Sequence, residues 1–469
     1  MIQYSKYKNF LNKIKYAIGS NLISLLVSVL TTLLIPKYLG NIEQYGYYRM
    51  YLFYASYVGL FHLGWCDGIL LKDGGKKYED LDKAKYSSQF WLLCLTETII
   101  FFSIIIGTLL YSDNSNTKFI SCLVASNLIV YIPTLMLSYF LQMTNRIREY
   151  ALIISFNKFA HILIIIINFI IGTQKYELFV LGEFTSQLFG LGYACYICKD
   201  IISVKPIKLI EAVKHASKYI YIGSKLLFSN LASMLITGIV QWGVQLKWDV
   251  TTYGKISFTL SISNLVLTFI NAIAIVLFPT LRRIERERLS YIYCKARNML
   301  MIILFGCLVF YCPIRVVLSA WLPQYSESLK YMAFLFPVCV YAAKMTMLIQ
   351  TYMNVLRLEK IIMKINILGM VIAVVTTVIT VFLFENVTLA MVSIVINQIF
   401  RCIYAEHELS KHIQITVSKD ILIEMLLTVV FVLSNGFVGE WYGAIIYLIF
   451  YLIFLFSKKR DVIEKNSCW

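Results

Sequence analysis

Residues 62–81 read HLGWCDGILLKDGGKKYEDL, and they place an acid, Asp67, inside an apolar stretch that ends abruptly in lysines and carboxylates. This pattern is typical of the end of a membrane-crossing helix, because basic residues beyond an apolar segment hold that end at the cytoplasmic face. Gly64 and Gly68 flank the acid. Glycines at these positions allow a neighbouring helix to approach closely, or open the helix locally.

The composition of the 469-residue chain indicates a membrane protein. Hydrophobic residues make up 59% of it and charged residues only 15%, with a mean hydropathy of +0.72. Soluble globular proteins carry about 25% charged residues. The net charge of +17 lies between long apolar runs, which favours a membrane surface and excludes a nucleic-acid partner. The eleven cysteines form no paired CxxC motif, so neither a metal site nor a cofactor is expected.

Fourteen apolar segments are long enough to cross a bilayer, which takes about 20 residues. They are 17–36, 46–71, 88–111, 118–143, 150–172, 176–198, 221–246, 254–279, 298–320, 329–356, 361–384, 387–405, 421–438 and 440–457. Lysine and arginine gather in alternate loops, so the positive-inside rule predicts that both termini are cytoplasmic. The opposite loops are short, roughly ten residues or fewer, which speaks against a membrane glycosyltransferase or polysaccharide polymerase.

Two halves of the chain start alike. YAIGSNLIS (16–24) and YIGSKLLFS (221–229) each precede a Tyr-Gly pair by about 25–30 residues. We therefore predict two six-helix bundles and a terminal helix pair, a plan common among transporters that bind substrate between halves. The predicted boundaries are 1–198 for the first bundle, 199–220 for a cytoplasmic linker, 221–405 for the second bundle, and 406–469 for the helix pair and its basic tail.

The stretch IPKYLGNIEQYGYYRMYLFYASYVGLFHLGWCDGILLKDGGKKYEDL (35–81) resembles the N-terminal signature of bacterial polysaccharide flippases, and VLFPTLRR (276–283) is similar to the close of their eighth helix. These flippases belong to the multidrug/oligosaccharidyl-lipid/polysaccharide exporter superfamily. The resemblance implies a MATE-like fold in the bacterial inner membrane. It also implies translocation of undecaprenyl-pyrophosphate-linked oligosaccharide repeat units for surface polysaccharide biosynthesis, alongside a polysaccharide polymerase and a chain-length regulator as partners.

Polar residues in the apolar segments are the candidate site residues, because a charge in the bilayer needs a partner or a wet cavity. Lys158, His161 and Asn168 share one face of their segment and suit an anionic headgroup. Lys344, seven residues beyond a helix-kinking Pro337, is the matching cation of the second half. Either lysine can instead belong to an internal ion pair. Arg49 and Lys247, near the expected outer surface, are candidates to line the exit or to anchor helix ends.

Three acids are candidates to bind a coupling proton or sodium ion: Glu97, Asp67 and Glu183. Glu97 lies deepest, and a pair with Lys158 would silence it. Asp67 can also form a salt bridge with Lys72.

No Walker loop, HExxH or GxSxG motif occurs, so we expect a transporter and not an enzyme. The leading hypothesis is a flippase working by alternating access. A cation-coupled multidrug exporter of the same superfamily is the first alternative, and its cavity would favour acids over lysines. A polymerase or glycosyltransferase is the second. A major-facilitator carrier is the third, suggested by the DGGKK that follows the second segment.

Overall fold

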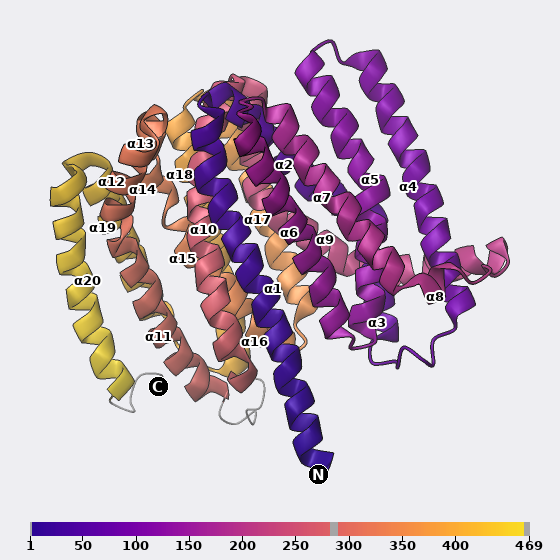
Figure 1. The fold of residues 1–469 in the computed structure, drawn as a ribbon. Helices are drawn as coiled ribbons and strands as arrows, with labels where there is room; N and C mark the ends of the chain where they lie inside the picture. The colour runs from indigo at the N-terminus through magenta and orange to yellow at the C-terminus, as the bar shows by residue number, and fades with distance from the viewer. Residues whose placement is uncertain (1, 282–288, 464–469) are drawn as a thin grey trace. The chain divides into compact units, whose positions relative to one another are not determined.

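The computed structural model describes the backbone of residues 2–281 and 289–463, and side-chain environments at 19, 22–268, 289–439 and 441–458. Helices make up nearly all of these residues, and no strand occurs among them, so the predicted all-α class is confirmed (Figure 1). Part of VLFPTLRR (276–283), part of the basic loop that follows it, and the end of the C-terminal tail lie outside the described residues.

Eleven helices in the described part of the chain are long and apolar enough to span a membrane. The predicted count of about fourteen is thus not confirmed. The segment predicted at 46–71 is absent from the eleven because it is divided into α2 (Ile42–Tyr57), the 3-10 helix η1 (Val58–His62) and α3 (Trp65–Asp73). The break lies at Leu63 and Gly64, whose φ angles of 52° and 83° are left-handed and end a right-handed helix.

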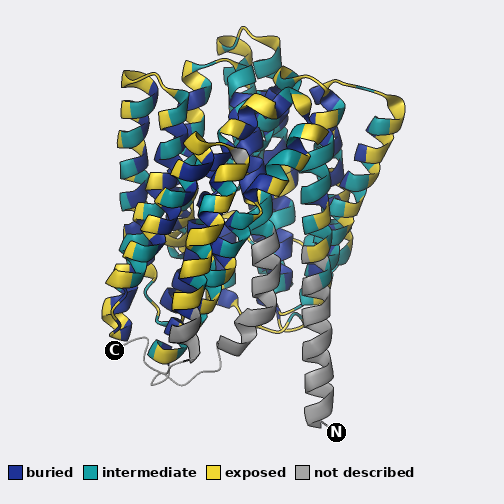
Figure 2. Cartoon of the chain, turned by 90° about the vertical axis from the view of Figure 1, so that its left-hand side faces the viewer, coloured by how far each residue is buried: buried dark blue, intermediate teal, exposed yellow. Residues whose placement is uncertain are grey.

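Helix α4 (Lys83–Tyr111) shows why these helices suit a bilayer. Large apolar side chains recur on it every three or four residues, and each is about half exposed: Trp91, Leu95, Ile99, Phe102, Ile106 and Leu109. Exposed positions run along whole helices and not only at their ends (Figure 2). A continuous exposed apolar stripe is costly in water and favourable against lipid. The protein is a multi-pass membrane protein.

The chain folds into two compact units, Met1–Leu231 and Ala232–Trp469. The first holds α1 (Ile2–Leu39), α2, η1, α3, α4, α5 (Ser115–Met143), α6 (Ile147–Ile171), α7 (Tyr176–Ile197), α8 (Lys199–Ile202) and the start of α9 (Leu209–Lys247). Within it α4 lies beside α5, and α6 beside α7 (Figure 1). The predicted linker 199–220 contains α8 and the first three turns of α9.

Glycines bring α3 and α9 into backbone contact. A Cβ at Gly68 would overlap the carbonyl oxygen of Tyr219, and one at Gly223 would overlap the carbonyl oxygen of Gly64. No side chain fits between the two helices at this seam. The glycines around Asp67 therefore do both things that the sequence left open: they break the helix at Gly64, and they let a neighbour approach.

The second unit holds the rest of the chain, and its described residues include three π-helical segments, η4 to η6. Its elements are α10 (Val250–Leu281), α11 (Leu289–Val309), α12 (Tyr311–Trp321), η3 (Pro323–Tyr325), α13 (Ser326–Lys330), α14 (Met332–Leu335), α15 (Val338–Ala343), η4 (Lys344–Ile349), α16 (Gln350–Val355), α17 (Glu359–Thr377), η5 (Val378–Leu383), α18 (Val387–Ile413), α19 (Ser418–Leu433), η6 (Ser434–Val438) and α20 (Glu440–Ile463). The helix is interrupted between α14 and α15 at Pro337, where proline removes a backbone donor.

Candidate functional site

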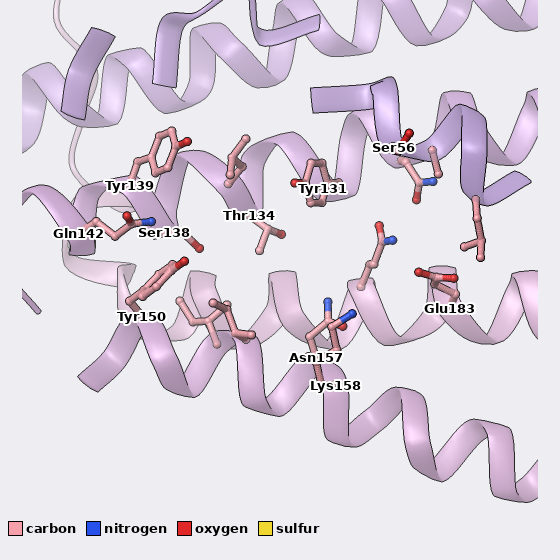
Figure 3. Close-up of a pocket in the computed structure, with 17 residues that line it drawn as sticks. Ser56, Tyr131, Thr134, Ser138, Tyr139, Gln142, Tyr150, Asn157, Lys158 and Glu183 are labelled. Carbon is pink, nitrogen blue, oxygen red and sulfur yellow. The ribbon is translucent and has the colours of Figure 1, made fainter. Parts of the chain in front are cut away.

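A cavity of about 620 Å³ opens within the first unit, between α2, α5, α6 and α7 (Figure 3). Seventeen residues line it, and twelve of them have polar side chains; the other five are Leu52, Ala55, Leu135, Ile153 and Ile154. A polar hollow of this size is rare in a membrane protein unless it is wet, because unsatisfied polar groups are costly in hydrocarbon. The cavity is therefore the candidate functional site.

Helical spacing explains why these side chains meet. On α5, Thr134, Ser138 and Gln142 follow one another at intervals of four residues, and on α6 Tyr150, Asn157 and Lys158 recur at seven or eight. Residues at such intervals share a helix face. The exposed side of α6 carries Phe156, Phe159, Leu163 and Ile166, so its polar stripe is turned inward.

Lys158 on α6 and Glu183 on α7 are the two charged residues among those that line the cavity, and both are half-buried (Figure 3). No ion pair of Lys158 is found among the residues that the structure describes. The Oε2 atom of Glu183 is buried and accepts no hydrogen bond within the described part. The cavity thus holds one cation and one anion, each available to a ligand. Their roles in binding stay predictions.

His161 and Asn168, predicted to share the stripe with Lys158, are buried against α7 and do not line the cavity. The Nδ2 atom of Asn168 donates to the carbonyl oxygen of Leu178, 3.2 Å away. Arg49 on α2 is half-buried and also lies outside the cavity lining. At 100° per residue, His161 lies about 60° and Asn168 about 80° around the helix from Lys158, in the same direction. That side of α6 packs against α7 and not against the cavity.

Asp67 and Glu97 are buried, at 6% and 1% exposure, and neither lines the cavity. Asp67 accepts a hydrogen bond from Tyr139, 3.3 Å away, and the ring of Tyr139 is part of the cavity lining. The Nε2 atom of His62 lies 3.9 Å from the other carboxylate oxygen. Asp67 is thus one side chain removed from the cavity, and no ion pair between it and Lys72 is found among the described residues. Glu97 pairs with no lysine among the described residues, and its Oε2 has no hydrogen-bond partner there.

Lys344 lies in a different environment, a buried ionic cluster of the second unit. Its Nζ is 2.5 Å from Glu406 and 2.7 Å from Glu424, and the side chain is 1% exposed. The guanidinium of Arg297 contacts the same two carboxylates, at 2.6 Å each, and Asp420 at 3.0 Å. This is the internal ion-pair alternative that the sequence left open. Lys344 is enclosed by carboxylates, and this environment leaves its ammonium group no open side for a headgroup.

Lys247 ends α9 and forms a partly exposed ion pair with Glu385, 2.6 Å away, which anchors a helix end. The sequence reasoning missed the α5 side chains of the cavity, because Ser, Thr and Tyr carry no charge. The four-residue spacing of Thr134, Ser138 and Gln142 on α5 is the sequence signal that could have revealed this polar face. The sequence reasoning also missed Arg297, Glu406 and Glu424. Arg297 and Glu406 each lie one residue outside a predicted segment, and Glu424 lies in the first turn of its segment, so none of them stands out as a charge deep in the bilayer.

The fold is similar to that of solved transporters. The lipid II flippase MurJ in an inward closed conformation matches with a TM-score of 0.64 at 15% identity, over 97% of this chain and 100% of that chain. A MOP superfamily transporter from Pyrococcus furiosus, described as having a binding pocket of reversed polarity, matches at 0.54 and 11% identity, over 86% and 95%. A MATE protein in complex with MaD5 matches at 0.53 and 11%, over 86% and 96%.

The fold is similar to that of MOP superfamily transporters. At these identities the likeness shows the fold alone, and it does not assign a substrate. No protein-family model matches the sequence, and no curated protein matches it either.

Proposed function

We propose that the protein is a flippase that moves undecaprenyl-pyrophosphate-linked oligosaccharide repeat units across the bacterial inner membrane by alternating access, for surface polysaccharide biosynthesis. The observation that carries the proposal is the position of Lys158: a lysine without an ion-pair partner in the described part, in a polar cavity within an apolar bundle. A lysine attracts a diphosphate as a point charge and does not demand one geometry. The resemblance of residues 35–81 to polysaccharide flippases supports the same substrate class.

The size of the cavity fits a headgroup. Small-molecule pockets measure about 300–1,000 Å³, so 620 Å³ can take a diphosphate and part of its sugar but not a polyprenyl chain. The exposed apolar stripes of the outer helices leave the lipid tail in the bilayer. Ten of the twelve polar side chains supply hydroxyl or amide groups for sugar hydroxyls, and the other two are Lys158 and Glu183.

The test is the loss of flipping in a chain that still folds. Deleting the gene is expected to make lipid-linked repeat units accumulate in the inner leaflet. Complementation with Lys158→Ala is expected to restore little surface glycan, and Lys158→Arg, which keeps the charge, to restore more. Lys175→Ala is the matched control, because Lys175 is an exposed lysine at the start of α7 outside the cavity. Normal glycan with Lys158→Ala at equal protein level would remove Lys158 from the mechanism.

Glu183 favours one second candidate, a cation-coupled multidrug exporter. A partly buried carboxylate without a hydrogen bond at one oxygen can attract a cationic drug. In that case cells lacking the gene would retain cationic dyes, and Glu183→Gln would abolish efflux while surface glycan stayed normal. If the protein is the proposed flippase, cells lacking the gene would not retain cationic dyes. Glu183→Gln would then leave dye efflux unchanged and lower the amount of surface glycan.

A further inference from the structure

Four lysines lie around the buried Tyr219 of α9. They are on the side of the first unit where α3 ends and α4 begins (Figure 1). The Nζ atoms of Lys72 and Lys85 lie 4.9 and 5.2 Å from the centroid of its ring. Lys218 precedes Tyr219 in the chain, and Lys76 lies in the loop that follows α3, beyond Gly74 and Gly75. We call Lys72, Lys76, Lys85 and Lys218 the Tyr219 lysine cluster.

One carboxylate, Asp73, lies at the base of this cluster, and its oxygens are already occupied. Asp73 is 3% exposed and accepts hydrogen bonds from Lys76 at 2.5 Å, from Tyr86 at 2.9 Å and from Tyr219. Lys85 lies 3.9 Å from it. Asp73 can therefore balance part of the charge of Lys76 and Lys85, but neither Lys72 nor Lys218 has an ion pair among the residues that the structure describes.

Lys72 and Lys218 are exposed, and their charges act on each other. Partial burial and then the charge of Lys218 lower the pKa of Lys72 below its ordinary value. Like charges held close together raise the energy of an empty site, and a multivalent anion that enters it relieves the repulsion. Phosphate groups are anions that lysine binds without demanding one orientation.

The base of the cluster is rigid. Tyr219 lies in the seam where Gly68 and Gly223 bring α3 and α9 into backbone contact, and no side chain separates the helices there. The hydrogen bonds of Tyr86 and Tyr219 to Asp73 join α4 and α9 to α3. The backbone positions of Lys72 on α3, Lys85 on α4 and Lys218 on α9 are thus fixed relative to one another, which lowers the entropic cost of holding a ligand.

We propose that the Tyr219 lysine cluster binds a diphosphate group and is the cytoplasmic docking site of the lipid-linked substrate before its headgroup enters the cavity. The inference rests on the proposed function for the identity of the diphosphate, and on the positive-inside rule for the side of the membrane. The ammonium groups of Lys72 and Lys218 have no ion-pair partner in the described residues, and that of Lys85 lies over the same tyrosine ring as that of Lys72. Their combined charge matches a diphosphate better than a phospholipid headgroup with a single negative charge. Lysines whose role is only to orient the helices in the membrane would not prefer a diphosphate to a phospholipid headgroup.

The first experiment measures binding of inorganic pyrophosphate to the full-length purified protein by titration calorimetry. Lys72→Gln/Lys218→Gln is expected to bind it about tenfold more weakly than the wild type, and added salt should weaken what remains. The control is Lys199→Gln/Lys205→Gln, two exposed lysines in the region of α8, which joins the start of α4 through an ion pair between Lys83 and Asp200. Equal affinity of both double variants would overturn the proposal.

Both target lysines are exposed, so the variants should fold, and equal thermal midpoints check this. The second experiment distinguishes substrate from bilayer lipid. In nanodiscs, pyrophosphate affinity is expected to be the same in phosphatidylglycerol and in phosphatidylcholine. A loss of affinity in phosphatidylglycerol that Lys72→Gln/Lys218→Gln abolishes would assign the cluster to lipid headgroups instead.

Failure of the site and failure of the proposed function give different results. Transport of lipid-linked repeat units by wild-type proteoliposomes without pyrophosphate binding at the cluster would reject the site and keep the function. Pyrophosphate binding that depends on Lys72 and Lys218, in a protein that moves no such lipid, would keep an anion site and reject its role in flipping.

Discussion

Lys344 on η4 donates a hydrogen bond of 2.5 Å to Glu406 on α18, in a cluster where both side chains are about 1% exposed. Lys158, by contrast, lies in the lining of a polar cavity with no ion-pair partner in the described residues. The two lysines look alike in the sequence, because each interrupts an apolar segment. Their environments differ, and the next two predictions follow from that difference.

Lys344→Ala is expected to destabilise the protein by about 3–5 kcal/mol, because removing one partner of a buried ion pair leaves an uncompensated charge. Glu406 and Glu424 would then share Arg297 alone. The measurement is the thermal midpoint in detergent. Lys158→Ala is the paired control, and its midpoint should stay close to that of the wild type. A reversed order of the two midpoints would contradict the assignment of Lys344 to a structural cluster.

Glu183→Gln is expected to reduce the stimulation of transport by a pH gradient while leaving binding of the lipid-linked substrate intact. Glu183 is the acid in the cavity lining, and a carboxylate there can take up and release a coupling proton. The measurement is transport in proteoliposomes with and without an imposed gradient. Glu43→Gln, an exposed acid at the start of α2, is the control. Unchanged stimulation in Glu183→Gln would exclude Glu183 as the coupling site.

Gly223→Ala is expected to prevent folding or cost at least about 3 kcal/mol, since its methyl group would overlap backbone atoms of Gly64 and Gly68, which cannot move aside as a side chain can. Yield and the thermal midpoint in detergent measure the effect. Gly107→Ala on α4 is the matched control, because nothing lies within 4 Å of its Cβ position. That substitution should be neutral or stabilise by up to about 1 kcal/mol. Normal folding of Gly223→Ala would disprove the close seam.

Asp73 is expected to stabilise the protein at neutral pH and to lose this effect in acid. Burial raises the pKa of Asp73, but hydrogen bonds from Lys76, Tyr219 and Tyr86 outweigh burial, and the net pKa lies below its ordinary value. A carboxyl with a lowered folded pKa stabilises above its unfolded pKa of about 3.9, and the contribution disappears as the pH falls through the folded value.

Asp73→Asn should therefore cost about 1–3 kcal/mol at pH 7, and the difference from wild type should shrink below about pH 4. Thermal midpoints from pH 7 to pH 3 measure it. Asp80→Asn is the control, because Asp80 is an exposed residue of the loop that follows α3, and this variant should follow the wild type at every pH. A difference for Asp73→Asn that does not change with pH would mean that its carboxylate charge is not what stabilises this end of the bundle.

The sequence by itself determined the all-α membrane class, the extent of most helices and their breaks. Apolar runs of about 20 residues must be helical in lipid, where the backbone can satisfy its hydrogen bonds only within the segment. The break at Gly64 and the one at Pro337 were visible for an equally local reason, because these residues change what the backbone can do. The resemblance of residues 35–81 pointed to the superfamily whose fold the structure has.

Only the tertiary structure decided which polar residues face a cavity. Lys158 and Lys344 present the same local pattern, and their difference depends on what the neighbouring helices supply: Tyr and Ser side chains of α5 in one case, Glu406 and Glu424 in the other. The sequence pattern of one helix determines its polar face but not the partner of that face. The partner is set by packing between segments far apart in the chain, which is why a charge in an apolar run is equally well a ligand or half of an ion pair until the fold is known.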